Sequence, residues 1–355
     1  MRTLFKAVLW LAAALAGVAH AQDYRAPGRE RSVLTIYSTL DTAVFEPLVK
    51  DSQALHPQIG IRYELLDAMP QYQRFVRESD SGRPRADLLL STAMDLQVKL
   101  VNDGYAAPHI SENSQSLPAW ARWRDEAFGF TFEPAVMVFN QHAFGKRKMP
   151  RSRAELLDAI RSDPAFWDGK IGTYDISRSS VGYLLASQDI RQSSEFGALV
   201  EALADVHTQV EENTSTLLDQ VASGELVAGY NLLGSYARAR SLAGSPLVLV
   251  YPSDHTLVVS RTALIARDAP NPTAAHLFLE YLLSVRGQQV LSARSGLPPI
   301  RQEGGGLYGQ LGVHATQVGL LRPIALGPGL LVYLDKQKRQ RLLSIWRGIL
   351  DAPPP

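Results

Sequence analysis

The amino-acid sequence predicts an α/β protein with two lobes and mostly parallel sheets. Short runs of β-branched and apolar residues alternate with segments of helical spacing, and this alternation occurs in two separate blocks of the chain. Strand–helix–strand units of this length form open sheets with right-handed connections. The chain has 355 residues, and single hydrophobic cores stop growing at about 250–300 residues. Two domains are therefore expected.

Residues 1–21 have the pattern of a cleavable signal peptide. Arg2 and Lys6 are followed by an apolar run over 7–18, and Ala19-His20-Ala21 supplies the small residues that flank a cleavage site. The apolar run is shorter than the roughly 20 residues that a membrane-spanning helix needs. This segment predicts export to the periplasm without stable membrane insertion. The polar residues 22–31 lack periodicity and are predicted to form a flexible leader.

Composition and charge exclude several classes of partner. The chain carries 36 Lys and Arg against 35 Asp and Glu, so its formal net charge is +1, and loss of Arg2 and Lys6 with the signal leaves −1. A near-neutral balance provides no electrostatic footprint for nucleic acid or anionic lipid. The chain has no cysteine, which excludes both disulfides and lipidation of an N-terminal cysteine. We expect a soluble monomer.

The first block contains three strands, each followed by a helix. The strands are predicted at 32–37, 59–66 and 86–90, and the helices at 44–55, 71–78 and 96–101. Pro57 and Gly82 end the first two helices. Thr92, with Asp95 three residues later, fits a capping box at the start of the third helix.

The second block is longer and less regular. Strands are predicted at 128–140, 168–175, 226–231, 247–252 and 256–266, and helices at 184–188 and 270–291. Glu133 and Pro134 interrupt the first of these runs, so we interpret them as hinge residues. Crossovers near 132–135 and 251–256 divide the chain into lobe 1 (32–132 and 257–355, with C-terminal helices packed on either lobe) and lobe 2 (133–256).

Open α/β sheets bind ligands beyond the carboxyl ends of their strands, so two facing lobes predict one cleft between them. Three loops at these ends, Ser38-Thr39, Ser91-Thr92 and residues 177–180, each precede a predicted helix. Exposed N–H groups and the positive end of a helix dipole form an anion site there. Arg178 adds a guanidinium that binds a carboxylate or phosphate through two hydrogen bonds.

Each of these residues also has a purely structural interpretation. Serine and threonine are most often simple N-caps, Arg178 can be a solvated surface arginine, and Asp175 or Glu133 can be a cap or hinge group rather than a partner for a cationic group. The residues predicted to bind the ligand are Ser38, Thr39, Asp41, Ser91, Thr92, Asp175, Arg178, Ser179, Ser180, Asn231 and Tyr236.

Five segments in this order resemble one protein family. After the first strand with Tyr37-Ser38 come ALHPQIGIRYELLD at 54–67, ADLLLSTAMDLQVKLVNDGYAAP at 86–108, FGFTFEPAVMVFN at 128–140, IGTYDISRSSVGY at 171–183 and PIALGPGLLVYLDKQKR at 323–339. The chain is similar to the type 2 periplasmic solute-binding proteins of ABC transporters, in the ferric-ion-binding and phosphoglycerate-regulatory branch. The resemblance implies hinge closure over a solute, delivery to an inner-membrane ABC permease, and no catalysis or cofactor. It also allows a sensory accessory that reports to a membrane histidine kinase.

The loop at 229–236 is informative about the class of ligand. Iron-binding members of this family carry two consecutive tyrosines in that loop, whereas Tyr230 and Tyr236 are separated here. No HxxxH or HExxH spacing occurs either. The sequence therefore predicts no metal site and a small anionic solute, phosphorylated or carboxylated, with ferric-ion binding as a further alternative. It contains no GxSxG or Walker motif, so no enzyme is predicted.

Overall fold

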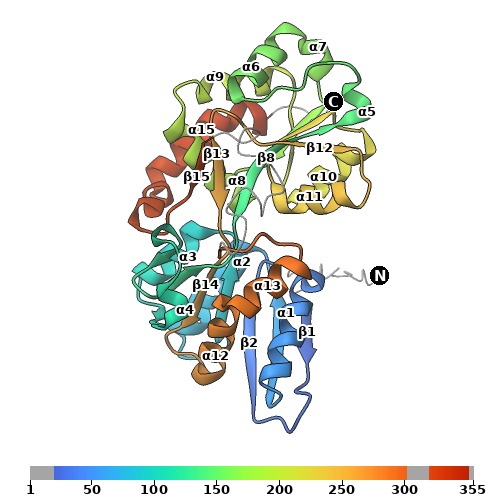
Figure 1. Cartoon of the computed structure of the whole chain (residues 1–355). Helices are drawn as coiled ribbons and strands as arrows, with labels where there is room; N and C mark the ends of the chain where they lie inside the picture. Colours follow the sequence, from blue (N-terminus) through green and yellow to red (C-terminus); the bar gives the residue numbers. More distant parts are fainter. Residues whose placement is uncertain (1–19, 302–319, 352–355) are drawn as a thin grey trace, which may run out of the picture.

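The computed structural model describes residues 20–301 and 320–351. Two lobes lie one above the other, each built on a sheet with helices packed around it (Figure 1). The predicted two-lobed α/β fold is thereby confirmed. Most of the predicted signal peptide, residues 1–19, lies outside the described residues.

The first sheet has eight strands in the order β1-β3-β2-β4-β14-β7-β6, with β5 paired to β14. Its strands are β1 (His20–Tyr24), β2 (Ser32–Ser38), β3 (Ile59–Leu65), β4 (Leu88–Ser91), β5 (Ala106–Ala107), β6 (Arg122–Trp123), β7 (Ala127–Gly129) and β14 (Thr262–Ala266). The helices of this lobe are α1 (Thr42–Leu55), α2 (Ala68–Asp80), α3 (Met94–Asn102), α4 (Glu112–Gln115), η1 (Ala119–Ala121), α12 (Pro272–Leu283) and α13 (Val285–Ala293).

The second sheet has seven strands in the order β10-β9-β11-β8-β13-β15, with β12 paired to β8. Its strands are β8 (Glu133–Asn140), β9 (Ile171–Tyr174), β10 (Gln209–Glu211), β11 (Ala228–Leu233), β12 (Leu247–Val250), β13 (Thr256–Val259) and β15 (Leu321–Pro323). The helices of this lobe are α5 (Gln141–Phe144), α6 (Arg153–Ser162), α7 (Pro164–Trp167), α8 (Ser180–Gln192), α9 (Phe196–Asp205), α10 (Thr214–Ser223), α11 (Gly234–Leu242) and α15 (Lys336–Leu350).

The sheets are mixed, which corrects the prediction of mostly parallel sheets. In the first lobe β2 is parallel to both β3 and β4, and in the second lobe β9 is parallel to both β10 and β11. However, β14 is antiparallel to β4, and β8 is antiparallel to β11, β12 and β13. β8 and β14 are the strands by which the chain enters a lobe from the other one. They run against the parallel strands because they approach from the hinge.

The two lobes are joined by short crossovers. The first lies between β7 and β8, beside the predicted hinge residues Glu133 and Pro134. The second lies at Ser260-Arg261, between β13 of the second sheet and β14 of the first, rather than at the predicted 251–256. Strands β13 and β14 are both fully buried, so the run 256–266 shows no change of polarity where the chain leaves one sheet for the other.

The C-terminal segment also contacts both lobes. Strand β15 pairs with β13, η3 (Pro328–Leu334) packs against α3 of the first lobe, and α15 packs against α9 of the second (Figure 1). The carbonyl of Tyr333 in η3 accepts a hydrogen bond from the hydroxyl of Tyr183 in α8. This segment therefore lies along one side of the interlobe boundary.

The predicted flexible leader at 22–31 is wrong for its first part. Residues 20–24 form β1, which pairs antiparallel with β3, and Gln53 Nε2 donates to the carbonyls of Tyr24 and Arg25 at 3.1 Å. Pairing through the backbone requires no apolar alternation, so the polar sequence gave no strand signal. Strand β1 covers an edge of β3 that would otherwise expose unpaired backbone groups.

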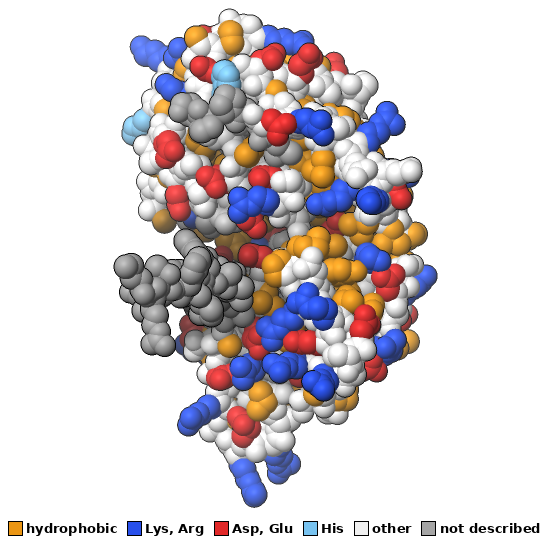
Figure 2. Space-filling model, turned by 180° about the vertical axis from the view of Figure 1, so that it is seen from behind, with side chains coloured by type: hydrophobic (Ala, Val, Ile, Leu, Met, Phe, Trp, Pro, Cys, Tyr) orange, Lys and Arg blue, Asp and Glu red, His pale blue; other side chains and the backbone are white. Residues whose placement is uncertain are grey.

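Each lobe is stabilised by its own aromatic and aliphatic core. Phe45 stacks on Tyr63 at 4.6 Å between ring centroids in the first lobe, and Phe144 packs edge-on against Trp167 at 5.7 Å in the second. Burial of one such side chain contributes about 1.5–3 kcal/mol. Charged side chains of both signs lie on both lobes (Figure 2). No helix among the described residues is long and apolar enough to span a bilayer.

Candidate functional site

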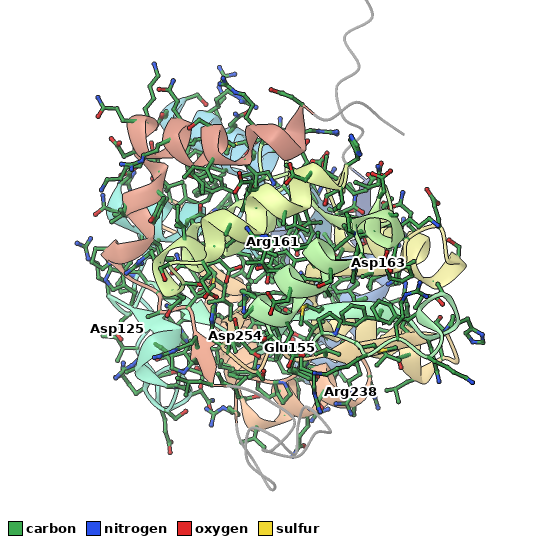
Figure 3. All side chains as sticks on the ribbon, turned by 90° about the horizontal axis from the view of Figure 1, so that it is seen from above. Asp125, Glu155, Arg161, Asp163, Arg238 and Asp254 are labelled. Atoms are coloured by element: carbon green, nitrogen blue, oxygen red, sulfur yellow. The ribbon has the colours of Figure 1, made fainter. Side chains whose placement is uncertain are left out.

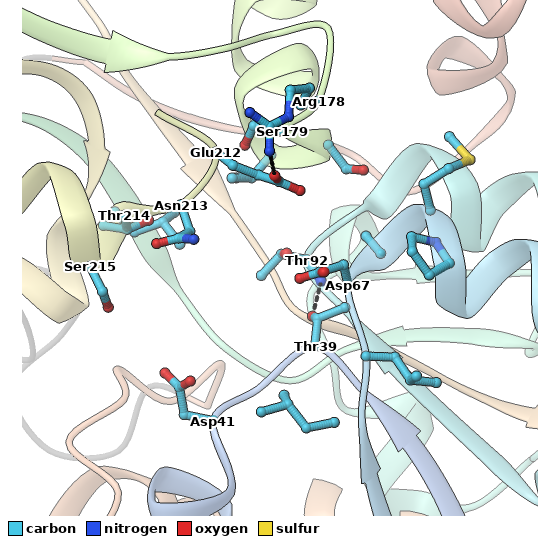
Figure 4. Close-up of a pocket in the computed structure, with 18 of the residues that line it drawn as sticks. Thr39, Asp41, Asp67, Thr92, Arg178, Ser179, Glu212, Asn213, Thr214 and Ser215 are labelled. Carbon is cyan, nitrogen blue, oxygen red and sulfur yellow. Dashed lines mark hydrogen bonds and ion pairs between the residues drawn. The ribbon is translucent and has the colours of Figure 1, made fainter. Parts of the chain in front are cut away.

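A cavity of about 310 Å³ lies between the lobes (Figure 4). Six helices begin at this cavity, three from each lobe. The residues that line it at these helix starts are Asp41 (α1), Asp67 to Met69 (α2), Thr92 (before α3), Ser179 to Val181 (α8), Asn213 to Ser215 (α10), and Leu233 and Tyr236 (α11). The parallel strands of both sheets end at the cleft, and so their following helices start there. The cavity is surrounded by N–H groups and positive dipole ends.

Seven of the predicted residues line this cavity: Thr39, Asp41, Thr92, Arg178, Ser179, Ser180 and Tyr236. Thr39 Oγ1 accepts a hydrogen bond from the N–H of Thr92 at 3.2 Å, which joins two of the predicted loops. Ser179 is the N-cap of α8, and its Oγ accepts from the N–H of Gly182 at 3.3 Å. Ser179 is therefore both a cap and a cavity residue, so the two interpretations do not exclude each other.

Four predicted residues do not line the cavity. Ser38 and Ser91 are buried, and each Oγ accepts from the backbone N–H two residues later, that of Leu40 or Ala93. These serines shape their turns and do not face the ligand space, as the capping interpretation allows. Asp175 acts similarly, because its Oδ1 accepts from the N–H and the hydroxyl of Ser177.

The fourth residue, Asn231, is buried inside the second lobe. Its φ of 63° places it in the left-handed region, at an irregularity in the pairing of β11 with β8. Its Nδ2 donates to Asp189 Oδ2 at 2.6 Å. Asn231 therefore holds a local bend in β11, and asparagine tolerates this backbone conformation better than most residues.

Several residues line the cavity although the sequence did not predict them, including Asp67, Arg261 and those at 212–215. Asp67 and Asn213 are N-caps of α2 and α10. A polar residue at the start of a helix, the pattern that identified the other loops, was therefore present at both positions. Arg261 has no local signal. It stands between two apolar strands, and only the crossover at that point brings it to the cavity.

The charges in the cavity are mixed. Arg178 Nη2 lies 2.7 Å from Glu212 Oε2, and the Arg178 side chain is 67% exposed (Figure 4). Asp67 and Asp41 are N-cap residues whose side chains do not cap their own helices, and both line the cavity. An ion pair as exposed as that of Arg178 contributes little stability, so this guanidinium can exchange Glu212 for a ligand at small cost.

A buried ion pair joins the two crossovers. Arg261 Nε donates to Glu133 Oε1 at 2.9 Å, and both residues are nearly inaccessible to solvent. Glu133 also accepts from the hydroxyls of Thr131 at 2.8 Å and Ser235 at 2.6 Å. The predicted hinge residue Glu133 is therefore bonded to the other crossover and to the start of α11.

This pair extends into the cavity through Tyr236. Arg261 Nη2 donates to the Tyr236 hydroxyl at 3.3 Å, and that hydroxyl donates to Asp41 Oδ2 at 3.0 Å. Burial raises the pKa of the Tyr236 phenol to about 12, so it stays protonated and donates at neutral pH. A continuous chain of contacts thus leads from the hinge across the cleft.

The two separated tyrosines of the 229–236 loop occupy different places. Tyr230 is buried among lobe 2 residues, where its hydroxyl accepts from Arg153 Nε at 2.9 Å and donates to Asp189 Oδ2 at 2.9 Å. Although burial opposes ionisation of Asp189, the charge of Arg153 lowers the pKa of this carboxyl below its usual value. Asp254, labelled in Figure 3, also contacts Arg153, at 3.3 Å. Tyr230 is thus not directed to the cavity that Tyr236 lines.

Potential metal ligands are not grouped in the described part of the chain. No set of three or more His, Asp or Glu side chains there has an arrangement that holds a metal ion. His109 and His276 contact each other at 2.9 Å, but they lie in the first lobe with Glu280, outside the cavity.

Comparison with known proteins identifies the family. Residues 83–304 match the family model of bacterial extracellular solute-binding proteins. The solved substrate binding protein of an ABC transporter from Agrobacterium tumefaciens is 36% identical, with a TM-score of 0.86, and the match covers 94% of this chain and 99% of that one. The chain therefore belongs to the extracellular solute-binding proteins and is a solute-binding protein of an ABC transporter. The family predicted from the sequence is confirmed.

More distant structures share the fold. Iron-bound HitA from Pseudomonas aeruginosa is 19% identical with a TM-score of 0.66, and the match covers 90% of this chain and 99% of that one. AfuA from Actinobacillus pleuropneumoniae, solved with exogenous fructose-6-phosphate bound, is 18% identical with a TM-score of 0.73, and the match covers 91% of this chain and 100% of that one. The comparison with curated proteins gives no match.

Proposed function

We propose that this protein captures a small organic anion, phosphorylated or carboxylated, in the cavity between its lobes and delivers it to an inner-membrane ABC permease. The observation that carries the proposal is the convergence of six helix N-termini on one cavity. Exposed N–H groups and dipole ends of this kind form an anion site without a metal.

The expected affinity is adequate for a transport protein. One helix N-terminus contributes up to about 2 kcal/mol in a partly buried site, and one hydrogen bond to a charged group about 1.5–3 kcal/mol. Arg178 and Arg261 both line the cavity, and Thr39, Thr92 and Ser180 add hydroxyl groups. A micromolar site needs about 8 kcal/mol, which a few of these contacts supply.

The carboxylates of the cavity refine the ligand. Asp41 and Asp67 would repel a bare inorganic anion, but they accept hydrogen bonds from hydroxyl or amino groups. The proposed solute therefore has an anionic group for the helix N-termini and donor groups elsewhere. The fructose-6-phosphate of AfuA is a solute of this kind and supports the proposal by analogy of fold.

The arrangement of the tyrosines gives less support to ferric-ion binding. Hard phenolate ligands would have to meet at one point, whereas Tyr230 is bonded to Arg153 and Asp189 inside lobe 2 and Tyr236 faces the cavity. Iron-bound HitA shows that this fold accommodates iron in that protein. Iron therefore belongs in the experiment as a competing ligand.

Capture is proposed to occur by closure about the two crossovers, after export to the periplasm and removal of residues 1–21. The Glu133–Arg261 pair joins these crossovers, and the Tyr236–Asp41 contact already bridges the cleft. We also expect a monomer without a cofactor or catalysis, since closure over a solute needs neither a second copy nor a reacting group.

Thermal unfolding of residues 22–355 with a panel of solutes tests the proposal. The panel contains phosphoglycerates, sugar phosphates, phosphonates, di- and tricarboxylates, amino acids, neutral sugars and ferric citrate. A ligand at a hundred times its Kd stabilises the folded state by about 2.7 kcal/mol, which produces a clear rise in the unfolding temperature. A rise with phosphorylated or carboxylated solutes supports the proposal. A rise in the unfolding temperature only with ferric citrate or neutral sugars would contradict the proposal, as would no rise with any solute of the panel.

A further inference from the structure

A second cavity of about 270 Å³ adjoins the first. It lies between α2 and α3 of the first lobe, the 176–180 loop and α8 of the second, and the C-terminal segment. Six residues line both cavities: Met69, Pro70, Arg178, Ser179, Ser180 and Glu212. The exposed Arg178–Glu212 pair is thus shared by the two chambers.

Asp95 distinguishes the second chamber. Its side chain is only 5% exposed and lines this chamber. Among the described residues, the hydrogen bond that Asp95 accepts from another residue comes from the backbone N–H of Leu96, 2.9 Å from Oδ1. A buried carboxyl with so few partners is costly unless something else binds it. Burial raises the pKa of Asp95 to about 6, which reflects this cost.

Arg339 also lines this chamber. This residue of α15 packs its guanidinium over the ring of Tyr183 at 4.6 Å and reaches the carbonyl of Ser177 at 3.5 Å. Its charge acts on Asp95, although no ion pair joins the two. The chamber therefore presents both a hydrogen-bond acceptor, Asp95, and a hydrogen-bond donor, Arg339.

The chemistry of these groups selects the ligand. Glu212 and Asp95 are balanced by Arg178 and Arg339, so the chamber offers no net attraction for an ionic group. A hydroxyl group both donates and accepts hydrogen bonds, whereas an ammonium group only donates and would leave the guanidinium without a partner. A hydroxylated end therefore matches this chamber better than a charged one.

We propose that the second chamber binds the hydroxylated far end of an elongated anionic solute, with Asp95 accepting from its hydroxyl groups and Arg339 donating to them. This inference rests on the proposed function, because the anionic group of the same solute occupies the first chamber. The first chamber alone is near the lower end of the range of about 300–1,000 Å³ for small-molecule sites. The solute class is thus an acid or phosphate with a polyhydroxylated chain, rather than a two- or three-carbon anion.

Isothermal titration with glycerol 3-phosphate and fructose 6-phosphate tests the inference. The two probes share a phosphate and differ in the length of the hydroxylated chain. We expect wild-type protein to prefer fructose 6-phosphate. Asp95→Ala and Arg339→Ala each lower the affinity for fructose 6-phosphate about tenfold, the effect of losing one hydrogen bond to a charged group, and change the affinity for glycerol 3-phosphate less than about twofold.

Two matched control variants replace an aspartate and an arginine that do not line the chamber. Asp103→Ala, at the other end of α3, and Arg347→Ala, in α15, leave both affinities unchanged. If wild-type protein binds both probes and the chamber variants keep the wild-type preference, the inference is overturned and the proposed function stands. If wild-type protein binds neither probe nor any other anion, the proposed function and the inference both fail. Arg339 is partly exposed, so we expect Arg339→Ala to fold. This variant tests the inference even if Asp95→Ala does not fold.

Discussion

The hydroxyl of Tyr236 in the second lobe donates a hydrogen bond to Asp41 Oδ2 in the first lobe, 3.0 Å away. The same hydroxyl accepts from Arg261, which is paired with Glu133 at the hinge. Tyr236 therefore connects the crossovers, the cavity wall and the opposite lobe. A ligand that enters the cavity meets a contact that already favours approach of the two lobes.

Tyr236→Phe tests whether this contact favours closure. The variant keeps the ring but loses the hydrogen bond between the lobes, which contributes about 0.5–1.5 kcal/mol. We expect a larger radius of gyration for the ligand-free variant in small-angle X-ray scattering. Tyr105→Phe is the control, since the Tyr105 hydroxyl donates to Asp80 within one lobe at 2.7 Å. Identical scattering by Tyr236→Phe and wild-type protein would show that the contact does not influence closure.

Glu133→Gln tests the buried ion pair of the hinge. The substitution leaves the guanidinium of Arg261 buried without its counter-charge, and loss of one partner from a buried pair costs about 3–5 kcal/mol. Urea unfolding measures this loss. Glu46→Gln, which removes an exposed pair with Lys50, should change the unfolding free energy by less than about 1 kcal/mol. If Glu133→Gln also changed the unfolding free energy by less than about 1 kcal/mol, the buried pair of the hinge would contribute no more stability than an exposed pair.

Asp95 makes stability depend on pH. Its pKa is raised to about 6 in the folded protein, against about 3.9 in an unfolded chain, so the folded protein holds the proton more tightly. Protonation therefore stabilises the fold. The contribution is fully present below pH 4 and is lost as the pH rises through about 6, a loss of about 3 kcal/mol.

Asp95→Asn removes this dependence. We expect the variant to be more stable than wild-type protein at pH 7.5 and equally stable near pH 4, as measured by urea unfolding at a series of pH values. Asp103→Asn serves as the control, because Asp103 is a partly exposed residue paired with Lys99. A variant that is less stable than wild-type protein at pH 7.5 would indicate that ionised Asp95 supports the fold rather than a ligand.

Glu212→Gln is expected to strengthen anion binding. Glu212 holds Arg178 at 2.7 Å, so a bound anion must compete with this carboxylate for the guanidinium. Loss of the charge frees Arg178 and removes a like charge from the cavity. We expect the binding free energy to become more favourable by about 1 kcal/mol, which titration would measure as an increase in affinity of about threefold to tenfold. A decrease would show that Glu212 accepts a hydrogen bond from the solute.

Local sequence patterns predicted those features that local residues determine. The parallel strands β2, β4 and β9 are short runs of mostly apolar or β-branched residues, and the loops after them carry polar residues at helix starts, so Thr39, Thr92 and Ser179 were found. The same reasoning failed where a serine after a strand can either face the cavity or bond to its own turn. Ser38 and Ser91 have the same residue type and the same position after a strand, but each Oγ is used by its own turn.

Features that depend on long-range pairing had no local signal. Arg261 is a single basic residue within an apolar run, and its partner Glu133 is 128 residues away. Strand β1 is polar and is determined by the open edge of β3. Asp95 was interpreted as part of a capping box, whereas its burial depends on α8 and the C-terminal segment that enclose the second chamber.

The central claim is that the interlobe cavity binds an organic anion through its helix N-termini together with Arg178. Isothermal titration of wild-type protein and Arg178→Ala with the solute that most raises the unfolding temperature tests this claim most directly. We predict at least a tenfold weaker affinity for Arg178→Ala, with an unchanged unfolding temperature of the ligand-free protein, since the Arg178 side chain is 67% exposed. Equal affinities for the two proteins would contradict the account.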